Sequence, residues 1–179
     1  MKINSAIIAA LKPCKDRFDN YVDNYGDSTF NIEDFVLLDK ITYDDKVWVV
    51  TRLFSKKQNA KWALLCASSV LSIFESKYPD DKRPRKALEA VQTWLVDPSE
   101  DNRKACRYAA DAATYASHYA AYAAYAAYAA ATYAADDASY AAANAVRYAA
   151  ADASYAAAKL QQQEVNLLFM VECAKEPKL

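Results

Sequence analysis

One stretch of the chain, residues 105–158, is written almost entirely in two amino acids: 29 of its 54 residues are Ala and 10 are Tyr. Alanine loses no side-chain entropy in a helix and leads the helix-propensity scale. The 78 residues from Ser99 to Glu176 also contain neither Gly nor Pro. A single helix of that length would be roughly 117 Å long, several times the diameter of a domain of this size. The tract is therefore predicted to be helical and to fold back on itself.

Internal repeats indicate where the tract turns. The heptapeptide DASYAAA occurs at 137–143 and at 152–158, and two near copies of an 11-residue segment begin at Arg107 and Arg147. We expect helical-hairpin repeats in this half of the chain, although simple expansion of the tract would leave the same trace. Asp, Ser and Asn compete with backbone hydrogen bonding and favour helix ends. The candidate turns are Ser117-His118, Asp136-Asp137 and Asn144.

Composition predicts an all-α fold. The 179 residues are 54% hydrophobic and include one Gly and five Pro, so helix breakers are scarce. We expect a single all-α domain over 1–179, a helical bundle with N-terminal helices at 1–98 and an Ala/Tyr-rich C-terminal half at 99–176. Helix should exceed about 65% of residues, without a β-sheet.

Local signals predict the helices that precede the tract. Thr42 and Asp45 form a capping-box variant ahead of a helix at 43–55. A helix at 58–78 buries Trp62, Leu65, Cys66, Ser69, Ile73 and Phe74 at helical spacing. Pro79 ends this helix, because a proline disfavours the α conformation in the residue before it.

Two further helices begin at clear N-terminal signals. Asp80-Asp81 is expected to cap a helix at 82–96, with Pro84 in its first turn, where the missing N–H matters little. Ser99 is expected to cap the helix that follows.

The start of the chain is also predicted to be helical. Ile3, Ile7, Ile8 and Leu11 mark one face of a short helix that Pro13 ends. This run lacks a signal-peptide pattern, and no stretch approaches the roughly 18 apolar residues of a membrane span. We therefore expect a cytoplasmic protein with no membrane partner.

Charge and cysteine usage argue against several functions. With 22 basic and 23 acidic residues the net charge is −1, which does not favour nucleic-acid binding. One His and isolated cysteines cannot complete a common zinc set, so we expect no metal and no cofactor. The cysteines, which we expect to be reduced and buried on apolar helix faces, are Cys14, Cys66, Cys106 and Cys173.

The segment Lys82–Lys86, KRPRK, is the one dense basic cluster. One interpretation is a salt-bridged corner between two helices, with nearby carboxylates at Glu75, Asp80, Asp81 and Glu89. The other is a site for an anion or an acidic partner. Its candidate cations are Arg83, Arg85, Arg107 and Arg147.

Tyrosines and paired carboxylates are the other candidate functional residues. Tyr gives contact area at low entropic cost, and the three-residue spacing of the tyrosines between Tyr115 and Tyr128 drifts around the helix. Core packing remains the alternative. Adjacent carboxylates diverge on a helix and sit at predicted helix starts, so they do not indicate catalysis. The candidate partner-binding residues are Tyr122, Tyr125, Tyr128, Asp136 and Asp137.

Two segments resemble a known family. CASSVLSIFE at 66–75 and PDDKRPRKALEA at 79–90, followed by Trp94, resemble the core of the immunity proteins of bacterial polymorphic-toxin systems, a family with phage-encoded members. Asp44 and Trp48 match a helix upstream of that core. The resemblance, which covers about 42–158, implies an all-helical, non-enzymatic protein that neutralises a target by binding it. The density of tyrosines departs from that family's pattern.

We therefore expect an inhibitor, either an immunity protein against a toxin or a phage protein that blocks a host-defence enzyme. Its partner would be a protein, with a second copy of the chain as another candidate. The alternative is a sponge that sequesters a small anionic nucleotide between helices, with Arg and Tyr lining the pocket. An enzyme ranks third, since no catalytic group is concentrated in the Ala/Tyr tract.

Overall fold

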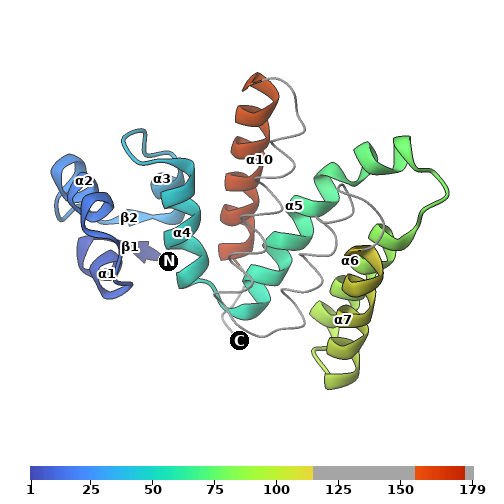
Figure 1. The fold of residues 1–179 in the computed structure, drawn as a ribbon. Coiled ribbons are helices and arrows are strands. Elements are labelled where there is room, and N and C mark those ends of the chain that lie inside the picture. Colours follow the sequence, from blue (N-terminus) through green and yellow to red (C-terminus); the bar gives the residue numbers. More distant parts are fainter. Residues whose placement is uncertain (115–155, 176–179) are drawn as a thin grey trace. The chain divides into compact units, whose positions relative to one another are not determined.

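Helices make up most of the residues that the computed structural model describes, which are 1–114 and 156–175 (Figure 1). The all-α class is confirmed. The chain groups into two compact units, 1–53 and 54–179. We expected a single domain with an Ala/Tyr-rich half beginning at residue 99, and the helices on either side of that point pack against each other.

The N-terminal unit is built from short elements. Its core is formed by apolar side chains from all of its helices, including Ile8, Tyr21, Phe35 and Val50. Its elements are β1 (Lys2–Ile3), α1 (Ser5–Ala10), α2 (Lys15–Tyr25), β2 (Phe30–Asn31), α3 (Ile32–Val36) and α4 (Tyr43–Leu53).

β1 and β2 form a two-stranded antiparallel sheet, with Lys2 opposite Asn31 and Ile3 opposite Phe30. The prediction of no β-sheet is therefore wrong, and so is the placement of Ile3 on the first helix. The reason is Asn4, whose side chain accepts the Ile7 backbone N–H at 3.0 Å and caps the helix. The helix starts after this cap, and Ile3 enters the strand, where it is fully buried.

The capping box expected ahead of α4 is confirmed. Asp45 Oδ2 accepts the backbone N–H of Thr42 at 3.2 Å, and Thr42 Oγ1 accepts the backbone N–H of Asp45, also at 3.2 Å. Each side chain satisfies a backbone donor that the first turn of a helix leaves without a partner. The box fixes where α4 begins and therefore which of its side chains face the unit's core.

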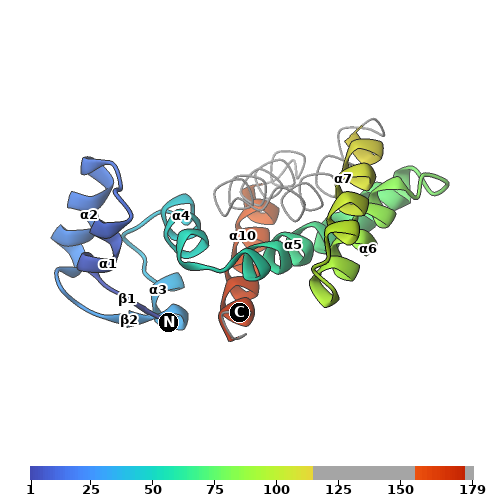
Figure 2. The same cartoon turned by 90° about the horizontal axis from the view of Figure 1, so that it is seen from below.

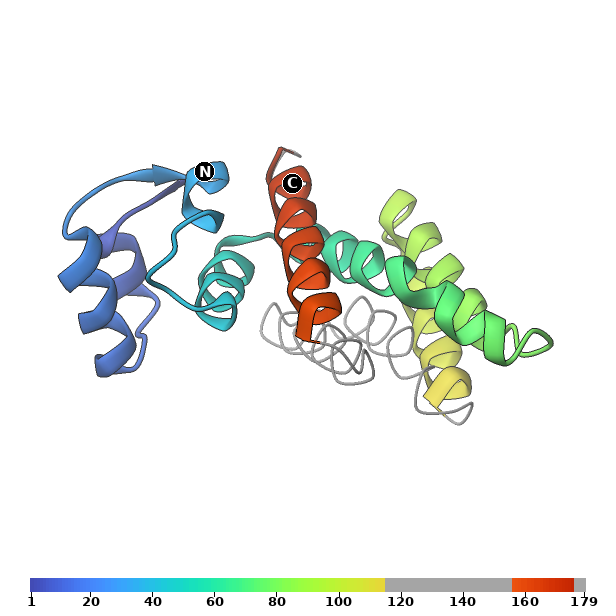
Figure 3. The ribbon, with the colours of Figure 1, turned by 90° about the horizontal axis from the view of Figure 1, so that it is seen from above.

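The second unit consists of longer helices. Its described elements are α5 (Lys56–Lys77), α6 (Arg83–Val96), α7 (Glu100–Thr114) and α10 (Ala156–Ala174). α6 packs against both α5 and α7, and α10 packs against α5. Figure 2 shows α6 and α7 side by side, and Figure 3 shows α10 crossing the N-terminal half of α5. The helices that contain the two ends of the Ala/Tyr tract, α7 and α10, thus pack against different helices of one unit.

α5 begins earlier than predicted, at Lys56 instead of 58, because Ser55 and Gln58 form a second capping box. Gln58 Oε1 accepts the Ser55 N–H at 2.9 Å, and Ser55 Oγ accepts the Gln58 N–H at 3.3 Å. Gln58 Nε2 also donates to the carbonyl of Cys173 at 3.1 Å. One side chain therefore caps the start of α5 and satisfies a carbonyl in the last turn of α10.

Two more hydrogen bonds join α5 to α10 and show that the helices run antiparallel. Trp62 Nε1 donates to the Asn166 carbonyl at 2.9 Å, and Gln162 Nε2 donates to Ser69 Oγ at 3.0 Å. Trp62 is buried as predicted. Ser69 was expected inside and is exposed, because its hydroxyl lies at the edge of this seam.

Other sequence predictions have mixed outcomes. Pro84 lies in the first turn of α6, and Ser99 Oγ accepts the Asn102 N–H at 3.4 Å ahead of α7, both as expected. The predicted turns within 117–144 lie outside the described residues. Within the described ranges, no helix is both long and apolar enough to cross a membrane.

Candidate functional site

The basic segment 82–86 lies at the start of α6, where two of its arginines form bidentate ion pairs. Arg85 Nε and Nη2 lie 2.7 and 2.5 Å from the carboxylate oxygens of Glu75. Arg83 Nε and Nη2 lie 2.9 and 2.6 Å from those of Asp81. The predicted salt-bridged corner between α5 and α6 is therefore confirmed.

The electrostatics of this corner follow from these contacts. Hydrogen bonds from Arg85 lower the pKa of Glu75, and hydrogen bonds from Arg83 lower the pKa of Asp81. Both arginines are well exposed, so solvent screening keeps the contribution of each pair to stability small. To bind an external anion, each guanidinium group would have to release its present carboxylate partner. Anion binding by Arg83 and Arg85 stays a prediction.

The structure places the other predicted site residues as follows. Lys82 and Lys86 line an open surface hollow together with Asp80 and Asp81. Arg107 is exposed on α7 and takes part in neither ion pair of the corner. The remaining candidates, Arg147, Tyr122, Tyr125, Tyr128, Asp136 and Asp137, lie outside the described residues.

Tyr108 on α7 is the first tyrosine of the Ala/Tyr tract, and 73% of its surface is exposed. Lys104 and Arg107, its neighbours on the helix, are exposed as well, whereas Cys106 is fully buried. An exposed tyrosine beside cations has an apolar ring and a polar hydroxyl available for contact, a combination that is enriched in protein interfaces.

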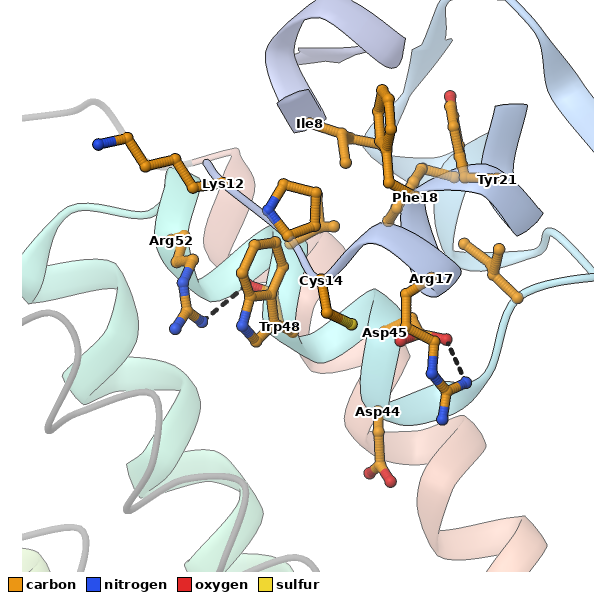
Figure 4. A pocket seen from close by; sticks show the side chains of 14 residues that line it. Ile8, Lys12, Cys14, Arg17, Phe18, Tyr21, Asp44, Asp45, Trp48 and Arg52 are labelled. Atoms are coloured by element: carbon orange, nitrogen blue, oxygen red, sulfur yellow. Dashed lines mark hydrogen bonds and ion pairs between the residues drawn. The ribbon is translucent and has the colours of Figure 1, made fainter. Parts of the chain in front are cut away.

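A pocket of about 480 Å³ lies within the N-terminal unit (Figure 4). Its walls come from α1, α2, α3, α4 and the loop that joins α1 to α2. Most of its lining is apolar, and charged side chains of both signs stand at its edge. The lining residues are Ile8, Lys12, Pro13, Cys14, Arg17, Phe18, Tyr21, Phe35, Ile41, Asp44, Asp45, Trp48, Val49 and Arg52.

The charged groups around this pocket are not equally compensated. Arg17 Nη1 lies 3.1 Å from Asp45 Oδ2, so this pair is neutral overall. The Arg52 guanidinium carbon lies 4.1 Å from the ring centroid of Trp48, within cation–π distance. Neither Arg52 nor Lys12 forms an ion pair with a carboxylate of the described residues. In Figure 4 these two cations lie on one side of Trp48, and Arg17 and Asp45 lie on the other.

Two residues that line this pocket, Lys12 and Tyr21, have energetically unfavourable features. Lys12 has φ +55°, a conformation that costs a residue with a Cβ roughly 1–2 kcal/mol. The Tyr21 hydroxyl is buried and has no hydrogen-bond partner among the described residues, and burial raises the pKa of Tyr21. Strain and unsatisfied polar groups of this kind concentrate at functional sites.

The cysteines do not point to nucleophilic chemistry. Burial raises the pKa of Cys66 well above its ordinary value and that of Cys106 to about 11, so these thiols stay protonated. Cys173 is also buried. The prediction that Cys14 is buried is wrong: it is exposed and lies just before α2, in the loop at the edge of the pocket. Among the described residues, no group of His, Cys, Asp and Glu is arranged to hold a metal ion.

Sequence reasoning missed this pocket entirely. Trp48 was named there only as a match to a helix of the resembling family, and no role was assigned to Lys12, Arg17 or Arg52. The pair Lys12-Pro13 was visible as a helix end, but the left-handed backbone at Lys12 follows from tertiary packing. The Trp48/Arg52 spacing of four residues was the one available signal, because such pairs share a helix face.

The comparisons with known proteins show one family. The model of DUF6931, described as a family of unknown function, matches residues 36–174, and the chain belongs to this family. No curated protein and no solved structure matches the chain. The match begins at the last residue of α3, so the α1–α2 side of the pocket precedes it.

Proposed function

We propose that this member of DUF6931 is a non-enzymatic inhibitor of the immunity-protein type, which neutralises a toxin or host-defence protein by binding it directly. The observation that carries the proposal is the exposed Tyr108 on α7, with the cations Lys104 and Arg107 beside it. Such a surface suits an acidic or mixed partner face, where a tyrosine ring is buried and charged groups at the rim set orientation.

Three carboxylates of the described residues have structural partners, which supports a scaffold role for them. Asp45 is engaged in the cap of α4 and in the pair with Arg17. Asp81 and Glu75 are engaged in the corner of α6. In this proposal these carboxylates hold the scaffold, and Tyr108 belongs to the partner-binding surface.

The test is neutralisation in cells. Each protein encoded beside this chain's gene is expressed in a bacterial host, alone and together with the chain, and growth is measured. We expect one neighbouring product to stop growth alone and to be harmless in the presence of the chain. Tyr108→Ala should keep the circular-dichroism spectrum and thermal melt of the wild type while weakening this rescue.

Tyr78→Ala is the matched control, because Tyr78 is a partly exposed tyrosine outside α7. It should leave the rescue unchanged. If no neighbouring product is neutralised, the immunity function is wrong. If Tyr108→Ala and Tyr78→Ala rescue equally well, the function stands, but the α7 surface is not its binding site.

A nucleotide sponge is the second candidate, and it has weaker support. A sponge needs cations that converge on one cavity, and two of its four candidates, Arg83 and Arg85, are already paired with carboxylates. Equilibrium dialysis of the purified protein against nucleotides separates the two functions, because only the sponge retains them.

A further inference from the structure

The pocket of the N-terminal unit has a size and a charge distribution that the proposed inhibitor function does not use. We propose that it is a binding site for a small amphipathic organic anion, with an apolar ring-bearing body in contact with Trp48 and a single carboxylate or sulfonate held by Lys12 and Arg52. This site is separate from the α7 surface and does not depend on the inhibitor function.

The size and lining of the pocket fit such a ligand. Its volume of about 480 Å³ falls in the range of small-molecule sites, which are mostly apolar with a few placed polar groups. Phe18, Val49 and Trp48 contribute carbon surface from two different helices. A ring-bearing body would remove this surface from water together with its own.

The position of the cations indicates that the ligand is negatively charged. Arg17 is neutralised by Asp45, and Asp44 points away from Trp48 in Figure 4. Lys12 and Arg52 remain, both lining the pocket and both on the same side of Trp48 in that view. A ligand over Trp48 would therefore meet positive charge at one end of the pocket.

The geometry of Arg52 favours a carboxylate or sulfonate. The guanidinium carbon of Arg52 lies over the Trp48 ring, and one N–H of the group donates to the Trp48 carbonyl at 3.4 Å. A guanidinium group has five N–H donors in a rigid fork that matches an oxyanion. Held in this way, Arg52 loses little further freedom when it binds an anion.

The number of polar groups limits the ligand class. Two uncompensated cations suit one anionic group, whereas a nucleotide polyphosphate would bring several charges. The apolar lining also offers few donors and acceptors for a sugar or a base edge. Ile8, Lys12, Cys14 and Phe18 precede the part of the chain that matches the family, so the first 35 residues complete this site.

The test uses 8-anilinonaphthalene-1-sulfonate, an anion with an apolar ring body, and its neutral counterpart N-phenyl-1-naphthylamine. Both are titrated into the full-length protein and followed by their fluorescence. We expect the anion to bind at one site, and Lys12→Gln and Arg52→Gln each to weaken it about tenfold. The neutral probe should bind more weakly and respond to neither substitution.

Lys2→Gln is the matched control, because Lys2 is an exposed lysine of the same unit that does not line the pocket. It removes the same charge and should leave the affinity of the anion unchanged. Arg52→Lys keeps the charge without the planar fork and should fall between wild type and Arg52→Gln. Thermal melts confirm that each variant is folded.

Cys14 locates the bound probe, since it is the exposed one of the four cysteines and lines the pocket. Alkylation by iodoacetamide, followed by intact mass, should add one group, and saturating anion should slow this reaction. The proposal is overturned if Cys14 reacts at the same rate with and without the anion. It is also overturned if both Gln variants bind the anion as the wild type does, or if the neutral probe binds equally well.

Discussion

Trp62 in the second unit and Tyr21 in the N-terminal unit are both buried aromatic side chains that carry a polar group. They differ in what that group meets. The indole N–H of Trp62 donates to the Asn166 carbonyl at 2.9 Å, whereas the Tyr21 hydroxyl has no hydrogen-bond partner among the described residues. A buried polar group without a partner costs free energy. The polar group of Trp62 therefore joins two helices of the second unit, whereas that of Tyr21 lies beside the pocket of the N-terminal unit.

The hydrogen bonds between segments that are distant in the sequence also differ between the two units. In the second unit, two side chains of α5 make buried hydrogen bonds to backbone carbonyls of α10, more than 100 residues away in sequence. In the N-terminal unit, the long-range polar contact between α2 and α4, from Arg17 to Asp45, is exposed. Buried contacts depend on complementary packing, so substitutions should affect the second unit more.

The largest expected effect is that of Trp62→Ala. Because Trp62 is fully buried, we expect its loss to reduce the free energy of unfolding by about 3–5 kcal/mol. Trp48→Ala, at the wall of the pocket, is the comparison in the N-terminal unit and should cost clearly less. Urea denaturation followed by circular dichroism measures both. Equal costs would contradict the difference between the two units.

The next effect is that of Gln58→Ala, which removes a helix cap and a buried hydrogen bond together. We expect a loss of about 2–3 kcal/mol in the free energy of unfolding, from a cap of about 1 kcal/mol and a buried bond of similar or larger size. Gln58→Glu keeps the acceptor for the Ser55 N–H but loses the donor to Cys173. It should also be destabilising, whereas Lys57→Ala should be close to neutral in urea denaturation.

Tyr21→Phe tests the buried polar group of the N-terminal unit and, unlike the substitutions above, should increase stability. It removes a buried hydroxyl that has no partner and keeps the ring contacts with Tyr25 and Phe35. We expect the free energy of unfolding to rise by about 1 kcal/mol. Trp62→Phe, which also deletes a polar group from a buried aromatic, should lower it. A fall for Tyr21→Phe would mean that the hydroxyl is satisfied in solution.

The smallest expected effect concerns the corner of α6 and depends on pH. The pKa of Glu75 is lowered in the folded state by its hydrogen bonds from Arg85, so the pair stabilises the fold above the ordinary carboxyl pKa of about 4.3. This contribution is lost as pH falls through the lowered pKa of Glu75. We expect Arg85→Ala to melt slightly below wild type at neutral pH and together with it in strong acid. A difference that grew on acidification would contradict this pairing.

Sequence reasoning was most successful where a local rule decides the structure. Thr42 with Asp45, Pro84 and Ser99 each marked a helix start, because capping depends on residues within one turn. It failed at Ile3, whose apolar character fits a helix face and a strand equally well. It also read Ser55 as the end of one helix, although the capping box with Gln58 begins the next.

For the candidate sites, the basic segment 82–86 was visible in the sequence because its charges are adjacent. The carboxylate partners of Arg83 and Arg85 were among those expected, since Asp81 and Glu75 lie close along the chain. The pocket was not visible, because its walls come from residues up to 44 positions apart, Ile8 to Arg52. Hydrophobic periodicity marks such residues as buried without indicating that a cavity remains between them.

The sequence by itself determined that this chain is helical, where α4 and α7 begin, and which cations can pair at the corner of α6. These properties depend on propensity and on neighbours within a few residues. Only the tertiary structure decided that Ile3 pairs with Phe30, that Gln58 and Trp62 meet α10, and that Lys12 and Arg52 lie beside one apolar pocket. Each of these contacts joins segments that are distant in the chain, and such contacts are set by the packing of the whole unit.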